Sequence, residues 1–369
     1  MKKKVCLITY CHSPNYGAAL QLYATYKAIE LVGGNPIVLN YDNLHEKSQT
    51  NLSYKLFSEK NIKDFFKLLI SGYIFRSKIN GVKNFEKIYN ELNYSKKIES
   101  VSELTSFNDV DVFCVGSDQV WNPQITGDYD DVFFLNSDNL AQKRISYASS
   151  MGSLNYPTND TYVYKALSKF SYISVREGIA SDYLSHLLEK NVRTVVDPTL
   201  LFDCEEWLQF ARSSSFCGLN EKYVLVYALG GKSETLIKVA KRVAKKIGSK
   251  VALITLSTRP RGVDYQICNA SPLDFVNLFS KAEFIITNSF HGTCFSINLK
   301  KPFLSIYYDA NPGRAKDLLT KYELENRFVK TDSDIDDVFF ITKDIENANR
   351  LIREDANNAR VWLERAINE

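Results

Sequence analysis

Long apolar stretches and an excess of charge of either sign are both missing from this sequence. No stretch approaches the roughly 20 apolar residues of a membrane-spanning helix, and the apolar run after the N-terminal lysines is too short for a signal peptide. We therefore expect a cytoplasmic protein. The 46 basic and 43 acidic side chains leave a net charge of +3, so no overall field favours nucleic acid as a partner.

Common signatures of disulfide, metal and nucleophilic chemistry are missing as well. The seven cysteines are scattered without a CxxC pair, and several lie in apolar runs, which is typical of buried, reduced thiols. The four histidines form no HExxH arrangement, and no GxSxG segment occurs. The sequence thus predicts neither a metal site nor a bound cofactor.

What is present is an ordinary globular composition with alternating strands and helices. Hydrophobic residues make up 45% of the 369 residues and charged residues 24%, which fits a chain of two or three domains. Apolar runs such as 110–115 predict strands covered on both faces, as in parallel sheets. The predicted strands are 5–10, 36–41, 110–115, 144–149, 171–175, 193–196, 223–229, 251–256, 284–287 and 303–307. The predicted helices are 17–32, 177–190, 233–247, 272–279, 293–299 and 343–367.

A serine-rich segment at 213–215 divides this alternation into two series. The pattern predicts an α/β protein with two Rossmann-like, doubly wound domains and a site between them. The first covers residues 1–212, with a helical insertion at about 55–93, and the second covers residues 221–342. Residues 343–369 are predicted to form a C-terminal helix. Ligands bind at the carboxyl ends of strands in such sheets, so the candidate site residues are those that follow strands.

Polar and aromatic residues that suit a sugar follow two strands of the first domain. The segment after the first strand leads into a helix whose free amides favour an anion. The segment after the third strand combines a carboxylate, two amides and an indole, which suits sugar hydroxyls. The alternative interpretation of this segment is a turn with a capping Asp and a buried Trp. These candidates are Asn15, Tyr16, Asp118, Gln119, Trp121 and Asn122.

Three basic residues could bind an anion. Arg176 follows a strand and presents a rigid fork of donors suited to carboxylate or phosphate. The alternative for it is a salt bridge with Glu177 or Asp182. Lys232 lies in a Gly-rich turn that lacks the full spacing of a phosphate-binding loop, and Arg259 lies in an irregular loop.

The most informative segment runs from Asn288 through Ser289, Phe290 and His291 to Gly292. It lies at a strand-to-helix turn, where a histidine is a natural acid or base and a glycine lets the backbone approach a ligand. The alternative is a histidine that serves only packing.

Six segments in consistent order carry a family resemblance. They are NYGAALQ at 15–21, VGSDQVWN at 115–122, SYA at 146–148, SVRE at 174–177, VDPTLL at 196–201 and TNSFHGT at 287–293. On these segments the sequence resembles the polysaccharide pyruvyl transferase family. Some members that make ketals on cell-wall sugars carry Arg at the position of Ser289, and the insertion lies outside the shared core.

The resemblance implies a fold similar to GT-B glycosyltransferases, with a cleft between the two domains. It implies transfer of the enolpyruvyl carbons of phosphoenolpyruvate to two hydroxyls of a sugar, which gives a cyclic pyruvate ketal and inorganic phosphate without a metal or redox cofactor. The expected acceptor is a lipid-linked oligosaccharide or a repeat unit of a capsule or other surface polysaccharide.

By motif position, the resemblance makes His291 the general acid and base and Arg176 the clamp for the donor. Phe290, Gly292, Ser289, Asn288, Lys232 and Arg259 are the further donor-binding candidates. Asn15, Tyr16, Asp118, Gln119, Trp121 and Asn122 are the acceptor-binding candidates. The second domain is therefore expected to bind the donor, and the first the acceptor.

Two alternatives to this function stay open. A GT-B glycosyltransferase that uses a nucleotide sugar would share the fold, although no ribose-binding acid is evident in the second half. A non-catalytic glycan-binding module would not need so many ionisable residues after strands.

The segment 55–87 combines eight Lys and Arg with three acidic residues and many apolar ones. This pattern suits peripheral contact with an anionic inner membrane face, where an enzyme with a lipid-linked acceptor would work. The alternative is a helical flap with a solvated basic face.

Overall fold

The computed structural model describes residues 2–45, 83–214, 216, 218–229, 233–257, 261–307, 313–329, 340 and 342–369. Lys232, Arg259 and most of the predicted insertion, with its proposed membrane contact, lie outside the described residues. The described part forms two compact units. The first consists of residues 2–45, Ile88–Leu201 and Glu354–Glu369, and the second of residues 83–87 and Phe202–Arg353.

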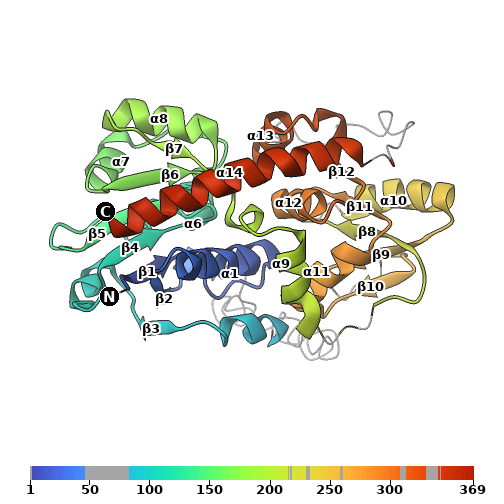
Figure 1. Cartoon of the computed structure of the whole chain (residues 1–369), viewed down its shortest axis with the longest axis horizontal. Coiled ribbons are helices and arrows are strands. Elements are labelled where there is room, and N and C mark those ends of the chain that lie inside the picture. Colours follow the sequence, from blue (N-terminus) through green and yellow to red (C-terminus); the bar gives the residue numbers. More distant parts are fainter. Residues whose placement is uncertain are drawn as a thin grey trace, which may run out of the picture. The chain divides into compact units, whose positions relative to one another are not determined.

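The first unit contains a seven-stranded sheet in the order β3-β2-β1-β4-β5-β6-β7 (Figure 1). Every neighbouring pair of strands is parallel. The strands are β1 (Lys4–Ile8), β2 (Asn35–Asn40), β3 (Tyr94–Lys97), β4 (Val112–Val115), β5 (Lys143–Ser149), β6 (Tyr172–Val175) and β7 (Arg193–Thr194). The helices are α1 (Tyr16–Leu31), α6 (Pro123–Thr126), α7 (Asp160–Leu167) and α8 (Gly178–Leu188).

The second unit contains a six-stranded sheet in the order β10-β9-β8-β11-β12-β13, again parallel throughout. The strands are β8 (Tyr223–Tyr227), β9 (Lys250–Ile254), β10 (Tyr265–Ile267), β11 (Phe284–Thr287), β12 (Phe303–Ile306) and β13 (Phe328–Val329). The helices are α9 (Cys204–Phe210), α10 (Ser233–Ile247), α11 (Pro272–Lys281), α12 (Phe290–Asn298) and α13 (Gly313–Lys321). The C-terminal helix α14 (Lys343–Asn368) begins in this unit and ends in the first.

Both sheets reverse their strand order in the manner of Rossmann domains. The reversal lies between β1 and β4 in the first sheet and between β8 and β11 in the second. Ligands of doubly wound sheets bind outside the carboxyl ends of the strands at such a point. The fold therefore directs attention to the residues after β1 and β4, and to those after β8 and β11.

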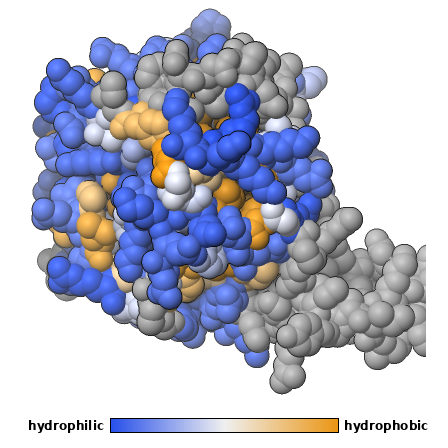
Figure 2. Space-filling model, turned by 90° about the vertical axis from the view of Figure 1, so that its right-hand side faces the viewer, coloured by the Kyte–Doolittle hydropathy of each residue, from blue (hydrophilic) through white to orange (hydrophobic). Residues whose placement is uncertain are grey.

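Amphipathic helices cover the apolar strands. In α10 the apolar side chains pack inward on β8 and β9, while Lys238, Lys241, Arg242, Lys245 and Lys246 are exposed. Figure 2 views the molecule from the right-hand side of Figure 1, where α10 lies. Hydrophilic side chains cover most of the described part of this face, and apolar ones are exposed in smaller groups among them. Among the described residues, no helix is both long and apolar enough to span a membrane.

Two of the boundaries that differ from those predicted by the sequence matter for the site and for the division into units. The helix expected at 293–299 begins at Phe290, because Ser289 caps it by accepting a hydrogen bond from the amide of Gly292 at 3.2 Å. The units divide at Leu201 and not near residue 212, because α9 packs with the second unit. Trp207 of α9 is buried there against Phe295, with ring centroids 4.9 Å apart.

This packing predicts a local loss of stability when the indole is removed. Trp207→Ala should lower the free energy of unfolding of the second unit by about 3–5 kcal/mol, because it leaves a cavity among aromatic rings. The matched control is Leu208→Ala, at a 40% exposed position of the same helix. This change should lower the free energy of unfolding by about 0.5 kcal/mol or less. Hydrogen exchange should accelerate in α11 and α12 of the Trp207 variant. Acceleration in β4 and β5 instead would contradict the assignment of α9.

Candidate functional site

The loop after β4 is held in an unusual backbone conformation at the carboxyl edge of the first sheet. Gly116 has a φ of +115°, and a Cβ there would lie 2.3 Å from the carbonyl oxygen of Tyr147. Asp118 has a φ of +70°, which non-glycine residues rarely adopt. The amide of Ser150 donates to the carbonyl oxygen of Asp118 at 2.9 Å. Such positions cluster at functional sites, where surrounding contacts hold them.

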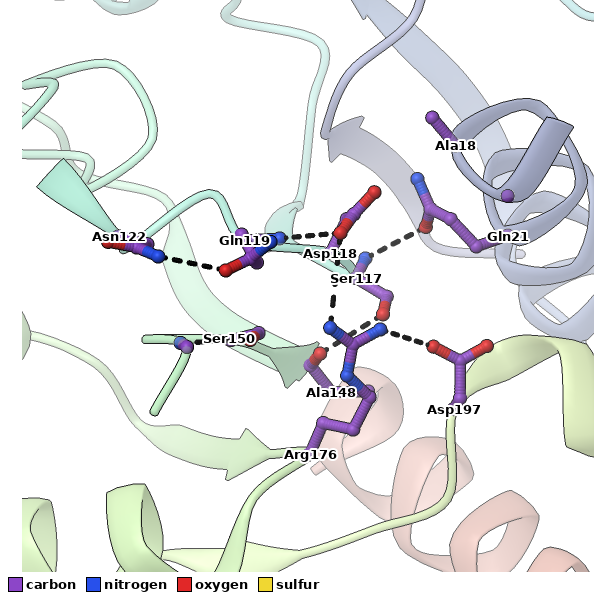
Figure 3. Close-up of polar contacts among 12 residues, drawn as sticks. Ala18, Gln21, Ser117, Asp118, Gln119, Asn122, Ala148, Ser150, Arg176 and Asp197 are labelled. Carbon is purple, nitrogen blue, oxygen red and sulfur yellow. Dashed lines mark hydrogen bonds and ion pairs between the residues drawn. The ribbon is translucent and has the colours of Figure 1, made fainter. Parts of the chain in front are cut away.

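The buried side chain of Gln21 connects α1 to this loop (Figure 3). Its Oε1 accepts from the amide of Ser117 at 3.2 Å, and its Nε2 donates to Oγ1 of Thr9 at 3.0 Å. The same Thr9 hydroxyl donates to the carbonyl oxygen of Ser117 at 2.9 Å. Asn15 caps α1 by accepting from two backbone amides of its first turn. Gln21 thus supports the loop that presents Asp118, and Asn15 fixes the start of the helix that carries Gln21.

Arg176 follows β6 and is the centre of a buried charge cluster. Its Nη1 lies 2.6 Å from Oδ2 of Asp197, and its Nη2 lies 3.9 Å from Oδ1 of Asp118 (Figure 3). Its Nε donates to Oε1 of Glu177 at 3.2 Å. Asp197 also accepts from the amide and the hydroxyl of Thr199, at 2.9 and 2.7 Å. The side chain of Arg176 is only 4% exposed, whereas that of Asp118 is 15% exposed.

In this cluster one guanidinium contacts three carboxylates. Burial lowers the pKa of Arg176, but the carboxylates of Glu177, Asp197 and Asp118 outweigh burial, so that its pKa is raised and it stays charged. A further anion would meet a neutralised guanidinium and an excess of negative charge. These contacts disfavour the predicted role of Arg176 as an anion clamp and favour one in positioning the carboxylates.

The prediction that Trp121 contacts the acceptor is wrong. Its side chain is fully buried, and its Nε1 donates to the carbonyl oxygen of Phe133 at 2.9 Å. The indole packs against Phe134 and Phe170, with centroids 5.7 and 5.9 Å apart. The indole is the largest apolar surface of its loop, so burying it in the core gains most from the hydrophobic effect.

The other acceptor candidates differ in accessibility. Asn122 is buried and caps α6 through the amide of Gln124, while its Nδ2 donates to Oε1 of Gln119 at 2.8 Å. Tyr16 is buried as well. Asn15, Asp118 and Gln119 are partly exposed and are the candidates in this group that a ligand can reach.

The turn after β11 forms the corresponding edge of the second sheet. Asn288 pairs with the backbone of Leu229 just after β8, through bonds of 2.7 and 3.0 Å. Ser289 is buried and caps α12, while its own amide donates to Oγ1 of Thr287 at 3.0 Å. The side chains of Asn288 and Ser289 thus fix the turn, and both were predicted to contact the donor.

His291 lies in the first turn of α12, where the helix dipole and the backbone amides favour an anion. It is 7% exposed, and its ring lies edge-on to Phe290 with centroids 5.3 Å apart. Only glycine fits at position 292, because a Cβ there would lie 2.3 Å from Oγ1 of Thr287. The imidazole is therefore buried beside a helix N-terminus of the kind that favours anions.

The structure adds one residue that the sequence analysis missed. Arg314, in the first turn of α13, places its guanidinium carbon 5.4 Å from the centroid of the Phe290 ring. Its charge also acts on Tyr307. Burial raises the pKa of the Tyr307 hydroxyl, and the positive charge of Arg314 opposes this rise. No motif surrounds Arg314 in the sequence, so only the packing of α13 beside α12 reveals it.

The two edges differ in charge and chemistry. The first presents a carboxylate beside amide groups, and the second presents an imidazole, a helix N-terminus and a guanidinium. Within the described part of the chain, no group of three or more His, Cys, Asp or Glu is arranged to hold a metal ion.

Known structures share this architecture at low sequence identity. The UDP-GlcNAc 2-epimerase from Neisseria meningitidis bound to UDP-GlcNAc matches with a TM-score of 0.55 and 13% identity, over 99% of this chain and 99% of that chain. The corresponding epimerase from Methanocaldococcus jannaschii matches with a TM-score of 0.54 and 11% identity, over 96% and 93%. The S. aureus MnaA-UDP co-structure matches with a TM-score of 0.50 and 13% identity, over 100% and 92%. These likenesses show the fold, which is GT-B-like as expected.

The sequence has no significant match among curated proteins. The family model of polysaccharide pyruvyl transferase matches residues 15–310, which extend from the cap of α1 past the end of β12 and include the segments at both sheet edges. The match covers well over half of the sequence, so this chain belongs to the polysaccharide pyruvyl transferase family.

Proposed function

We propose that this protein transfers the enolpyruvyl group of phosphoenolpyruvate to two hydroxyls of a sugar, forming a cyclic pyruvate ketal and releasing phosphate. The acceptor is a unit of a surface polysaccharide or its lipid-linked precursor. The observation that carries the proposal is the pairing of His291 with a helix N-terminus and a nearby guanidinium at the strand-order reversal of the second sheet. Family membership supports the same chemistry.

The second unit is the proposed donor site. Phosphoenolpyruvate carries a carboxylate and a phosphate, and both need cations or oriented amide groups. The first turn of α12 supplies amides, and Arg314 supplies a cation beside Phe290. Ser289 stands where some family members carry Arg, so Arg314 is the proposed source of that charge. Lys232 and Arg259 remain predicted contributors.

The first unit is the proposed acceptor site. Its edge presents Asp118 as the most exposed of three carboxylates around one guanidinium, so this edge would repel the donor's anionic groups. Carboxylate and amide oxygens accept hydrogen bonds from sugar hydroxyls. Gln119 lies in the same loop as Asp118, and Asn15 lies in the loop after β1. The acidic character of this edge thus suits a neutral, hydroxyl-rich ligand.

The reaction requires proton transfer at carbon and at oxygen. One sugar hydroxyl adds to C2 of the donor while C3 gains a proton, and the second hydroxyl then replaces the phosphate at C2. His291 is the proposed group that gives the proton to C3 and regains one from a hydroxyl. A positioned acid or base of this kind typically contributes a factor of roughly 10²–10⁴.

The first prediction concerns the imidazole. His291→Ala should lower kcat for phosphate release by roughly 10²–10⁴-fold, because C3 loses its proton donor. The assay measures phosphate released from phosphoenolpyruvate with a panel of galactosyl and mannosyl acceptors. The control His186→Gln changes an exposed residue of α8 and should keep the wild-type rate. A His291 variant that keeps the wild-type rate would contradict the assignment.

A thermal-shift measurement separates this function from the alternative. Stabilisation of the protein by UDP or GDP sugars, with no response to phosphoenolpyruvate, would favour a nucleotide-sugar transferase instead.

The second prediction separates the two arginines. Arg314→Ala should lower kcat/KM for phosphoenolpyruvate by roughly 10- to 100-fold, as expected for the loss of one hydrogen bond to a charged group. Arg176→Met should instead lower the free energy of unfolding by about 3–5 kcal/mol, because it leaves buried carboxylates unpaired. Its folded fraction should keep the wild-type KM for phosphoenolpyruvate. A stable Arg176 variant with a much higher KM would restore Arg176 as the donor clamp.

A further inference from the structure

Four tyrosines of the first unit gather near the carboxyl edge of its sheet. These four residues form the tyrosine patch: Tyr129 in the segment after β4, Tyr156 in the segment after β5, Tyr162 in α7 and Tyr183 in α8. All four side chains are partly exposed, and three of them also pack against the core of the first unit. The patch therefore belongs to the same unit as the proposed acceptor site.

Hydrogen bonds at the start of α7 bring three of these rings together. The hydroxyl of Tyr129 accepts from the amide of Asn159 at 3.0 Å, and the hydroxyl of Tyr183 donates to Oδ1 of Asp160 at 2.7 Å. Asn159 caps α7 by accepting from the amide of Tyr162 at 3.1 Å. The rings of Tyr129 and Tyr162 have centroids 5.0 Å apart and planes at 35°. The three tyrosines therefore meet around the cap of this helix.

Tyr156 belongs to the same group. Burial raises the pKa of the Tyr156 hydroxyl, and the neighbouring hydroxyls of Tyr129 and Tyr183 raise it further, as groups close to one another do. The Tyr156 hydroxyl donates to the carbonyl oxygen of Met151 at 2.8 Å, which closes the loop between these two residues. The four tyrosines are thus neighbours, although they come from three separate segments of the chain.

The tyrosine patch adjoins the loop of the proposed acceptor site. The amide of Ser150 donates to the carbonyl oxygen of Asp118 at 2.9 Å, and the hydroxyl of Ser150 donates to Oε1 of Glu177 at 2.6 Å. Met151, which receives the hydroxyl of Tyr156, is the residue directly after Ser150. One residue that contacts the Asp118 loop is therefore followed by one that contacts the patch.

The polar groups that contact the patch include exposed carboxylates. The hydroxyl of Tyr162 donates to Oδ1 of Asp131 at 2.7 Å, and Asp131 is exposed. Hydrogen bonds from Thr158 and Tyr183 lower the pKa of Asp160, which is also exposed, so this carboxyl is ionised at neutral pH. Aromatic rings rimmed by carboxylates suit a neutral ligand with many hydroxyls.

What the patch offers to a ligand is mainly ring surface. The hydroxyls of Tyr156, Tyr162 and Tyr183 all donate to oxygens of the protein, and these bonds fix the rings in place. Ile179, which is 51% exposed, lies four residues before Tyr183 and thus on the same face of α8. Apolar surface that is exposed in one place and rimmed by polar groups is typical of a binding site.

We propose that the tyrosine patch is an extension of the acceptor site that binds the sugar units next to the unit receiving pyruvate, so that the substrate is an oligosaccharide. This inference rests on the proposed function. Sugar rings carry faces of C–H groups that stack on aromatic rings, and their hydroxyls donate to nearby carboxylates. The patch takes no part in bond making or breaking. It therefore determines the affinity for the acceptor and not kcat.

The experiment compares acceptors of two lengths, using the full chain and phosphoenolpyruvate. The probes are methyl β-galactoside and β-linked galactotetraose, together with a mannoside pair of the same lengths. In the wild type, KM for the active tetrasaccharide should be roughly 10- to 100-fold lower than KM for its methyl glycoside, because two or more sugar rings gain stacking contacts. The two kcat values should be similar.

Substitutions then test the rings themselves. Tyr183→Ala should raise KM for the tetrasaccharide roughly 3- to 10-fold, as expected for the loss of one stacked ring, and leave KM for the methyl glycoside unchanged. Tyr183→Phe retains the ring and should keep the wild-type KM. The matched control is Tyr164→Ala, at a 52% exposed position of α7 outside the patch, which should change neither KM. An equal rise of KM for both acceptor lengths in Tyr183→Ala would overturn the proposal.

Binding can also be measured without turnover. Saturation-transfer NMR irradiates the aromatic protons of the protein and detects the C–H protons of bound galactotetraose or mannotetraose. Transfer should be strong in the wild type and in Tyr183→Phe, and weaker in Tyr183→Ala. Equal transfer in Tyr183→Ala and the wild type would overturn the assignment of this ring.

Two failures are distinguishable. Absence of phosphate release by the wild-type protein with every acceptor would count against the proposed function, and the NMR measurement would then still show whether the patch binds the tetrasaccharides. An active wild type with equal KM for both acceptor lengths would overturn the role of the tyrosine patch alone.

Discussion

The parallel alignment of every strand is the constraint on which the rest of this structure depends. Parallel strands bring all their carboxyl ends to one edge of each sheet, and the reversal of strand order separates the loops at that edge so that a ligand can enter. Segments far apart in the sequence, such as 15–21, 115–122 and 174–177, therefore meet in the first unit. The polar residues of these segments lie at this edge because the strands and the helices that cover them bury apolar side chains.

Burial of charge determines how the first edge is built. Arg176 is surrounded by Asp118, Glu177 and Asp197, and taking such groups out of water is costly unless each has a partner. Their mutual pairing fixes the loops after β4, β6 and β7 and leaves Asp118 as the most exposed carboxylate among them. Among the residues that the structure describes, the second edge has no such cluster. There a capped helix terminus and the guanidinium of Arg314 provide positive potential, so the two edges differ in electrostatic character.

Most of the fold could be predicted from the sequence, because apolar runs and helix periodicity are strong signals. The strand 284–287 and the helix 233–247 agree with the structure to the residue. Short edge strands such as β10 and β13 were missed, since two or three residues give no pattern. The start of α12 was placed too late because the capping role of Ser289 depends on a hydrogen bond that the sequence does not reveal.

The site was predictable only in part, for a different reason. The sequence shows which residues follow strands, but whether a side chain faces a ligand or the core depends on packing. Trp121 and Arg176 both follow strands, yet the indole fills the core and the guanidinium neutralises carboxylates. Arg314 gains its significance from the ring of Phe290 on another helix, which no local motif records.

The most direct test of the central claim is the reaction in deuterium oxide with phosphoenolpyruvate and an active oligosaccharide acceptor. Transfer of the enolpyruvyl group predicts one phosphate released for each ketal formed, and a product methyl group that carries one deuterium, because C3 takes a single proton from the enzyme. Both quantities can be read by NMR and mass spectrometry. A product without a ketal methyl group, or release of a nucleoside diphosphate from a nucleotide sugar in place of phosphate, would contradict the account.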